Sequence, residues 1–206
     1  MRATLALLAA LLVASPAAAT QEYILPTLFD VTGVAANDVL NLRAEPNAGS
    51  QILGALPPDA TGVEVVEERR GWARVNLREA SGWVSMRYLA YRVDVWEEGR
   101  LPAAFSCYGT EPFWSVTARD GALALSTPET PETPETLFPV TAILGTGVFR
   151  DPTRVVLGEG AVLTAVPQQC SDGMSDRRFG LAALLTLTQG EPRLLSGCCS
   201  IEARPR

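Results

Sequence analysis

The sequence predicts an all-β protein built from two small antiparallel barrels in series, the second stapled by disulfides. Short runs of alternating apolar and polar residues recur along the chain, and Gly, Pro, Asn or Asp bound nearly every run. Alternation with a period of two is typical of half-buried strands, and regular turn signals between strands favour a barrel. The composition also shifts near residue 95, because all four cysteines follow it. We therefore expect one unit at residues 24–93, a junction at 94–102 and a second unit at 103–202.

Residues 1–19 have the pattern of a signal peptide. Arg2 precedes an apolar run at residues 5–14, a break at Ser15-Pro16 and three small residues at 17–19. These features predict cleavage before Thr20 and export to the periplasm. The apolar run is shorter than the roughly 20 residues that a membrane-spanning helix needs, so we expect a chain that does not span the membrane. Retention of the segment as an uncleaved tether is the alternative.

The first unit has strand patterns near residues 28–31 and at 39–46, 52–57, 63–66, 71–75 and 82–84, and it closes at residues 88–89. This meander of short strands resembles the bacterial SH3 domain. The resemblance implies a small barrel that docks peptides or glycan-linked peptides of the cell envelope and carries no catalysis of its own. The identity of the ligand and the oligomeric state stay open.

Five residues of the first unit are candidates for the ligand groove of such a module: Arg43, Glu45, Trp72, Trp83 and Tyr88. Trp72 and Trp83 each follow a glycine, a pattern that starts a strand after a tight turn, so one ring is expected to line the groove while the other fills the core. Arg43 and Glu45 follow the first clear strand, where they can contact a charged ligand. The alternatives are two core tryptophans and two solvated loop charges.

The junction contains Trp96, and an indole of this size favours packing on a surface over a freely swinging linker. Beyond it, strand patterns lie at residues 113–118, 122–125, 137–140, 154–157, 161–166, 179–187 and 193–198. The run at 181–187 is rich in Ala and Leu and is compatible with a helix, but its short length and its threonine favour a strand. Three Thr-Pro-Glu repeats at residues 127–135 predict an acidic, solvated loop, because proline at every third position blocks strand pairing.

The four cysteines are Cys107, Cys170, Cys198 and Cys199. An even number in an exported chain favours two disulfides over metal ligation. A bridge between neighbouring cysteines is strained, so we expect Cys198 and Cys199 each to pair with one of the other two. Both assignments stay open.

Three blocks of the second unit contain every cysteine: CYGTEPFW at residues 107–114, CSDGMSDRRF at 170–179 and GCC at 197–199. In this order they resemble a family of proteobacterial envelope proteins, a resemblance that carries no activity over. Charged residues flank the cysteines, so the bridges are expected to gather them at one end of the barrel. They either pair and lock loops or form a recognition site: Glu111, Asp172, Asp176, Arg177 and Arg178. Met174 is expected to plug the barrel mouth.

The residue types that are missing exclude most catalytic chemistry. The chain has no histidine and no lysine, so its 17 cationic residues are all arginine. This removes Ser-His and Cys-His nucleophiles, Schiff bases, Ser-Lys dyads and zinc sites that use histidine. A glycan hydrolase that works with two carboxylates is the remote alternative. We expect a protein that is not an enzyme and that uses no cofactor and no metal.

The formal net charge of −6 disfavours nucleic acid and anionic membrane surfaces as partners and favours a cationic protein. The main hypothesis is an envelope-binding protein that recognises cell-wall peptide or an envelope protein. The alternative is an inhibitor of a cationic cell-wall hydrolase. That alternative rests on a resemblance in architecture to the periplasmic inhibitors of C-type lysozyme, whose Ser-Gly-x-x-Tyr motif has no counterpart here. Whether the two units share one site is left open.

Overall fold

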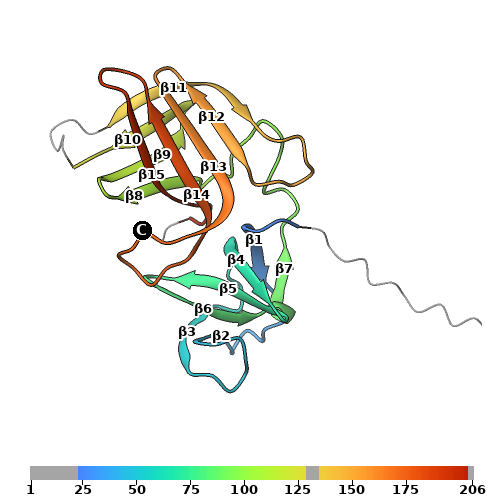
Figure 1. Ribbon diagram of the computed structural model, residues 1–206. Coiled ribbons are helices and arrows are strands. Elements are labelled where there is room, and N and C mark those ends of the chain that lie inside the picture. The colour runs from blue at the N-terminus through green and yellow to red at the C-terminus, as the bar shows by residue number, and fades with distance from the viewer. Residues whose placement is uncertain (1–22, 129–134, 204–206) are drawn as a thin grey trace, which may run out of the picture.

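The computed structural model describes residues 23–128 and 135–203. The predicted signal peptide at 1–19 and residues 129–134 of the Thr-Pro-Glu tract lie outside this part of the chain. Strands β1 to β7 form one unit and strands β8 to β15 form a second unit beside it (Figure 1). The all-β prediction is confirmed. Within the described residues, no helix is both long enough and apolar enough to cross a membrane.

The first unit is a seven-stranded antiparallel sheet in the order β3-β2-β6-β5-β4-β1-β7. A short 3-10 turn, η1 (Met86–Tyr88), connects its last two strands. The strands are β1 (Thr27–Val31), β2 (Leu40–Arg43), β3 (Ile52–Leu56), β4 (Val63–Arg69), β5 (Trp72–Leu77), β6 (Ala80–Ser85) and β7 (Leu89–Tyr91).

The core of this sheet follows from the alternation seen in the sequence. Phe29, Leu42, Val65, Val75 and Val84 are at most 1 % exposed and belong to one apolar cluster. Burying such side chains contributes about 1.5 to 3 kcal/mol each. The alternation therefore indicates the inward face of strands such as β1 and β2, whose burial alternates residue by residue.

The second unit is a closed barrel of eight antiparallel strands in the order β10-β11-β12-β13-β14-β15-β8-β9. The run at residues 179–187 is a strand, as predicted, and β15 closes the barrel by pairing with β8. The strands are β8 (Ser106–Thr110), β9 (Phe113–Arg119), β10 (Ala122–Ser126), β11 (Thr136–Leu144), β12 (Arg154–Gly158), β13 (Ala161–Cys170), β14 (Phe179–Leu187) and β15 (Arg193–Ser200).

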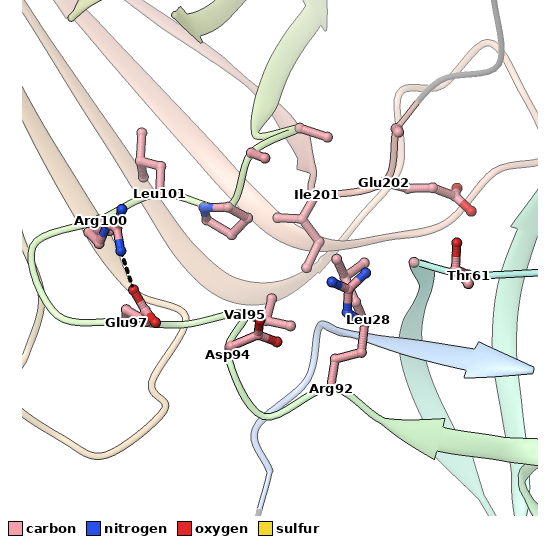
Figure 2. Close-up of a pocket in the computed structure, with 15 residues that line it drawn as sticks. Leu28, Thr61, Arg92, Asp94, Val95, Glu97, Arg100, Leu101, Ile201 and Glu202 are labelled. Carbon is pink, nitrogen blue, oxygen red and sulfur yellow. Dashed lines mark hydrogen bonds and ion pairs between the residues drawn. The ribbon is translucent and has the colours of Figure 1, made fainter.

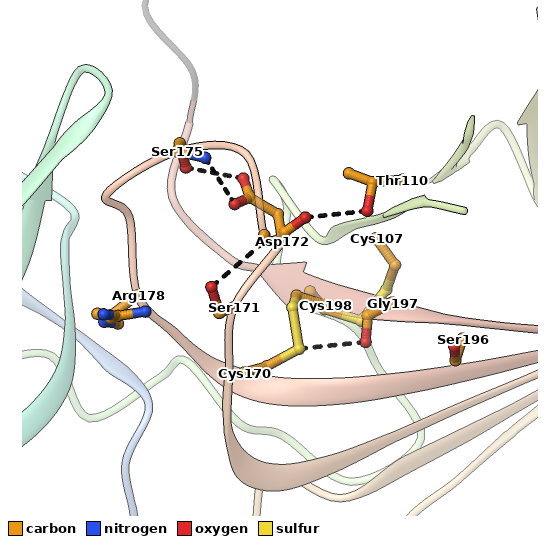
Figure 3. The surroundings of a disulfide bond; sticks show 12 residues. Cys107, Thr110, Cys170, Ser171, Asp172, Ser175, Arg178, Ser196, Gly197 and Cys198 are labelled. Atoms are coloured by element: carbon orange, nitrogen blue, oxygen red, sulfur yellow. Dashed lines mark hydrogen bonds between the residues drawn. A yellow bond between two sulfur atoms is a disulfide. The ribbon is translucent and has the colours of Figure 1, made fainter. Parts of the chain in front are cut away.

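Two disulfides staple this closure, which confirms the prediction that neither bridge joins the neighbouring cysteines. Cys107 on β8 bonds to Cys199 on β15, directly opposite in the strand pairing. Cys170 at the end of β13 bonds to Cys198 (Figure 3). Both bridges therefore depend on the last strand.

The two units pack against each other through the junction. Trp96 is 6 % exposed, and its Nε1 donates a hydrogen bond to the carbonyl of Pro26 at 2.8 Å. The guanidinium of Arg154 stacks on the indole, 5.1 Å from the ring centroid. The same guanidinium donates to the carbonyls of Glu97 and Arg100. The expectation that Trp96 packs on a surface is confirmed.

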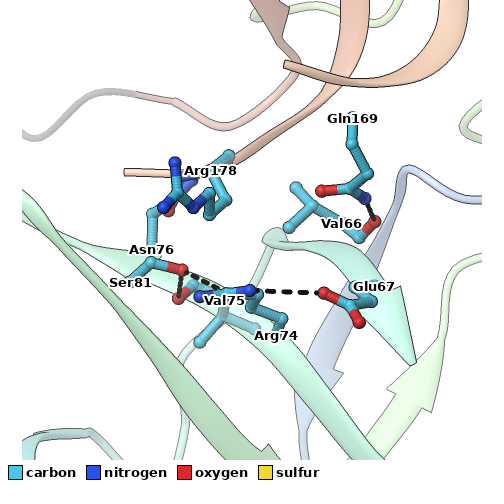
Figure 4. A network of polar contacts seen from close by, with 8 residues as sticks. All are labelled: Val66, Glu67, Arg74, Val75, Asn76, Ser81, Gln169 and Arg178. Carbon is cyan, nitrogen blue, oxygen red and sulfur yellow. Dashed lines mark hydrogen bonds and ion pairs between the residues drawn. The ribbon is translucent and has the colours of Figure 1, made fainter. Parts of the chain in front are cut away.

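Polar contacts between the units lie on the β4–β6 side of the sheet (Figure 4). Asn76 on β5 donates to the carbonyl of Arg178 at 2.7 Å and accepts from the amide of Arg178 at 3.0 Å. Gln169 on β13 donates to the carbonyl of Val66 at 2.9 Å. Because Asn76 is only 4 % exposed, its two bonds are shielded from water.

Candidate binding sites

The first candidate site is a cavity of about 540 Å³ on the first unit. It lies where the β1–β2 loop, β2, the start of β5 and the turn after β6 meet. Three of the five groove residues expected from sequence line it, namely Arg43, Trp72 and Tyr88. The structure thus brings these three side chains, which come from separate strands and turns, to one cavity.

The walls of this cavity combine aromatic rings with charges of both signs. Arg43 donates to the carbonyl of Ser50 at 2.7 Å, which fixes its stem along the β2–β3 loop. The guanidinium of Arg87 lies 5.4 Å from the ring centroid of Tyr88, a cation–π contact. The carboxylate of Asp38 lines the same cavity and caps the amide of Val39. This arrangement suits a ligand with both carboxylate and amine groups.

The other two groove candidates lie elsewhere. Trp83 is 5 % exposed, and the guanidinium of Arg74 covers its ring at 5.3 Å. Glu45 is exposed in the β2–β3 loop, where its backbone amide donates a hydrogen bond to the hydroxyl of Ser50 at 2.9 Å. Neither residue lines the cavity.

Sequence reasoning missed Asp38, Val39 and Arg87 as lining residues. Val39 is 46 % exposed, although it opens an apolar run that reads as a strand. Arg87 precedes Tyr88, which the sequence analysis did name, and both residues lie in the η1 turn at the edge of the cavity. The pairing of Asp38 with the next amide is a local turn pattern that was readable in advance.

The second candidate site is the loop at residues 171–178, which carries most of the charged cluster. Figure 3 shows Asp172 folded back on its own loop. Its carboxylate accepts from the amides of Met174 and Ser175 and from the hydroxyl of Ser175. Burial works against the charged form, but these bonds and the charge of Arg177 hold the pKa of Asp172 below its usual value. Thr110 donates to the carbonyl of Asp172 at 2.9 Å and ties the loop to β8.

The rest of this loop docks on the first unit through its backbone. The amide of Asp176 donates to the carbonyl of Glu79 at 3.1 Å, and Arg178 makes the two bonds with Asn76 described above. In the described part of the chain, no ion pair within 4.0 Å joins any two members of the cluster. Hydrogen bonds that involve the loop backbone, and not ion pairs within the cluster, therefore hold Asp172, Asp176 and Arg178 in place.

A smaller cavity of about 370 Å³ lies over this loop, lined by Tyr108, Phe113, Asp172 and Arg177 among others. Glu111 is exposed at the turn between β8 and β9, outside this cavity. Met174 is 69 % exposed, so the expectation that it plugs the barrel mouth is wrong. The reason is that the loop folds over toward the first unit and leaves this side chain at the rim.

The third candidate is a pair of acidic side chains between the two units. Glu64 on β4 is fully buried, and its Oε2 accepts a hydrogen bond from the hydroxyl of Ser200 at 2.5 Å. Burial raises the pKa of the Glu64 carboxyl to about 7, although Ser200, the nearby amide of Ile201 and the charge of Arg177 oppose the shift. Burial, and then the charge of Glu64, raise the pKa of Glu202 to about 7 as well. Sequence reasoning named neither residue.

Across residues 23–128 and 135–203, no group of three or more His, Cys, Asp or Glu side chains is placed to hold a metal ion. The four cysteines are consumed in the disulfides.

The comparison with protein families assigns the first unit. Residues 38–90 match the family model described as the bacterial SH3 domain. The match spans β2 to β7 and does not extend into the second unit, so the resemblance of its three sequence blocks stays an expectation. No curated protein and no solved structure matches the chain. The chain thus contains a bacterial SH3 domain, which suggests a module that binds peptide or cell wall.

Proposed function

We propose that this protein is an exported, non-enzymatic binding protein of the cell envelope, and that its SH3 domain holds cell-wall peptide in the cavity formed by Arg43, Trp72 and Tyr88. The observation that carries the proposal is the convergence of these residues, from three separate segments, on one cavity of about 540 Å³. A cavity of this size falls within the range of small-ligand sites.

The chemistry of the walls fits this ligand. Peptides of the cell wall carry free carboxylates and amines on an extended backbone. Arg43 and Arg87 can receive carboxylates, while Asp38 offers an acceptor for an amine. Trp72 and Tyr88 supply flat apolar surface with few rotamers to immobilise, which lowers the entropic cost of binding.

Retention on purified peptidoglycan sacculi tests the proposal. We expect the wild-type chain to sediment with sacculi at low salt and the Trp72→Ala and Tyr88→Ala variants to lose at least about 1 kcal/mol of affinity, roughly fivefold, each. Phe149→Ala is the matched control, because Phe149 is a 75 % exposed aromatic residue that lies outside the cavity. A folded wild-type protein that stays in the supernatant would remove wall binding from consideration.

The proposal that the protein is not an enzyme has its own test. Incubation with sacculi should release no soluble muropeptide. Release that disappears on substitution of a single Asp or Glu would replace this proposal with a carboxylate hydrolase.

A second candidate function, inhibition of a cationic hydrolase, is supported by the net charge of −6. An acidic surface accelerates encounter with a basic enzyme. Titration of lysozyme activity with the protein decides it. An unchanged rate at micromolar excess would eliminate this function, and inhibition without retention on sacculi would favour it over wall binding.

A further inference from the structure

One side of the second unit has an outer wall without charge. Strands β11 to β15 form this side, each hydrogen-bonded to the next (Figure 1). Within these five described strands the charged residues are Arg154 and Arg193, the first residues of β12 and β15. Both are in phase with core residues, Val156 and Leu195, and so out of phase with the outward side chains. Charged side chains gather instead around the cavity of about 550 Å³ between the units (Figure 2): Arg92, Asp94, Glu97, Arg100 and Glu202.

The strand register places ten uncharged side chains in two rows on this wall. Each row crosses all five strands from β11 to β15. The first row consists of Leu144, Val155, Thr164, Leu184 and Ser196. The second row lies nearer the β12–β13 and β14–β15 turns and consists of Ala142, Leu157, Val162, Thr186 and Leu194. We call these ten residues the barrel face.

The barrel face turns away from the core. Between its two rows runs a row that points inward and is at most 5 % exposed, namely Val156, Leu163, Leu185 and Leu195. None of the ten residues belongs to the apolar core cluster of the barrel. An antiparallel sheet that faces water on one side normally carries polar residues there. A contiguous uncharged face therefore marks a surface that contacts a partner.

The size of the barrel face fits a pair of identical surfaces. Leu144, Leu184 and Leu194 are 47 to 64 % exposed, and the other seven residues are at least partly exposed. Together they offer on the order of 500 Å² of accessible surface, within the range of functional patches. Two such faces in contact would bury about 1,000 Å², the lower limit for a specific interface of moderate affinity.

The net charge favours a second copy over other partners. A cationic partner is matched by carboxylates and an anionic partner by guanidinium groups, and the barrel face carries neither. Two copies of this chain each have a formal net charge of −6, so they repel each other wherever acids meet. They can approach closely only through a surface that has no charge, which is the property of the barrel face.

We propose that a second copy of this chain covers the barrel face, so that the two faces pack against each other in a two-fold symmetric dimer. Sheets that pack face to face lie about 10 Å apart with their strands about 30° apart, and a two-fold axis brings the same residues to both sides. No residue of the barrel face lines the SH3 cavity, so the dimer does not depend on wall-peptide binding there.

Sedimentation velocity over a range of protein concentrations tests the proposal, with the full chain and with a chain that begins at Thr20. We expect both to show a monomer–dimer equilibrium with a dissociation constant on the order of 100 µM, as an interface of this size allows. Raising NaCl from about 0.05 M to about 0.5 M should strengthen the dimer, because it screens the repulsion between two acidic chains. Amide chemical shifts of the wild type should change on dilution in β11 to β15 and not in the SH3 domain.

Substitutions on the barrel face should weaken the dimer. Leu184→Glu and Leu194→Glu each place a charge on both sides of the interface, so each should raise the dissociation constant at least about tenfold. Ile52→Glu is the matched control, because Ile52 is a 51 % exposed apolar residue on β3 of the SH3 domain. It should leave the dissociation constant unchanged.

Four outcomes would overturn the proposal. A wild-type chain that stays monomeric at about ten times the expected dissociation constant would show that the barrel face does not bind its own copy. A dimer that persists in both barrel-face variants, with wild-type melting temperatures, would place the interface elsewhere. A dimer weakened by Ile52→Glu or by salt would assign the contact to the edge of the SH3 sheet or to ion pairs. A dimer that forms only when residues 1–19 are present would assign it to that segment.

Discussion

The two units solve the problem of strand edges in different ways. The SH3 sheet leaves β3 and β7 as its end strands, has no disulfide in its described part, and carries the candidate groove on its surface. The second unit closes completely, and two disulfides fix the closure at β15. Closure removes the unpaired edges on which other chains can add. The comparison suggests that the open sheet binds the ligand and that the closed, disulfide-bonded barrel is the more stable unit that supports it.

Breaking the staple should produce the largest difference between the units. The Cys107–Cys199 bridge spans 92 residues, so its loss in Cys107→Ser/Cys199→Ser should destabilise the barrel by about 4.5 kcal/mol in the chain-entropy picture. The SH3 sheet should keep most of its protection. Hydrogen exchange resolved by peptide measures both units in one sample, and equal loss in the two would contradict the comparison.

An alanine in place of glycine should cost about 3 kcal/mol more stability at a packed position of the barrel than in a loop of the SH3 domain. A Cβ on Gly197 in β15 would run into the backbone carbonyl of Tyr108 and the ring of Trp114, so Gly197→Ala overpacks the barrel. Gly49, in a loop of the SH3 domain, has only the side chain of Asn47 nearby at 3.5 Å. Gly49→Ala should therefore be close to neutral. Urea denaturation of both variants gives the comparison, and similar midpoints would count against it.

The two hydrogen bonds between Asn76 and the backbone of Arg178 should contribute about 2 kcal/mol to the interaction between the units. Asn76→Ala leaves the amide and carbonyl of Arg178 without their partner in a buried place, a cost of about 1 to 3 kcal/mol. Calorimetry should then resolve two transitions where the wild type shows one. Asn37→Ala, at an exposed position of the first unit, is the control. One transition in both variants would show that the units are coupled by other contacts.

The acid pair between the units should give the smallest effect, in a defined pH window. The folded-state pKa values of Glu64 and Glu202 are raised from 4.5 to about 7, so the folded state holds more protons than the unfolded state between these values. The free energy of unfolding should fall as the pH rises from about 4.5 to about 7 and level off above. Few other side chains titrate there, because the chain has no histidine.

Glu64→Gln isolates this effect. The amide cannot ionise, so the decline should shrink and the variant should be more stable than the wild type at pH 8 by about 1 to 2 kcal/mol. Glu191→Gln, at an exposed position, should leave the decline unchanged. Urea midpoints across the pH range measure both, and a decline that persists in Glu64→Gln would assign it to other groups.

Local sequence pattern was enough for the two-bridge framework and for most of the strands, but β8 (Ser106–Thr110) was not among the predicted strands. Period-two alternation shows which residues face a core, and the strain of a vicinal bridge limits how neighbouring cysteines can pair. The choice of Cys199 as the partner of Cys107 was out of reach, because it depends on the register between β8 and β15, which are separated by most of the second unit.

The candidate sites could be predicted from the sequence only in part, because some of their residues are brought together by long-range packing. Arg43, Trp72 and Tyr88 sit in one unit with short connections, and their convergence follows from the SH3 pattern. Glu64 reads as the outward face of a half-buried strand, but all four residues from Val63 to Val66 are buried, because the second unit covers this part of β4. Its partner Ser200 is 136 residues away. Contacts of that range are set by packing between units, which local alternation does not encode.

The position of β15 governs the order in which this molecule can be completed during synthesis. This single strand supplies the seam of the barrel, one half of each sulfur bridge and the hydroxyl that meets Glu64. A nascent chain therefore carries an unsealed barrel until β15 has emerged, whereas every strand of the first unit is available long before. Premature termination or clipping ahead of this strand would cost the whole trailing half at once.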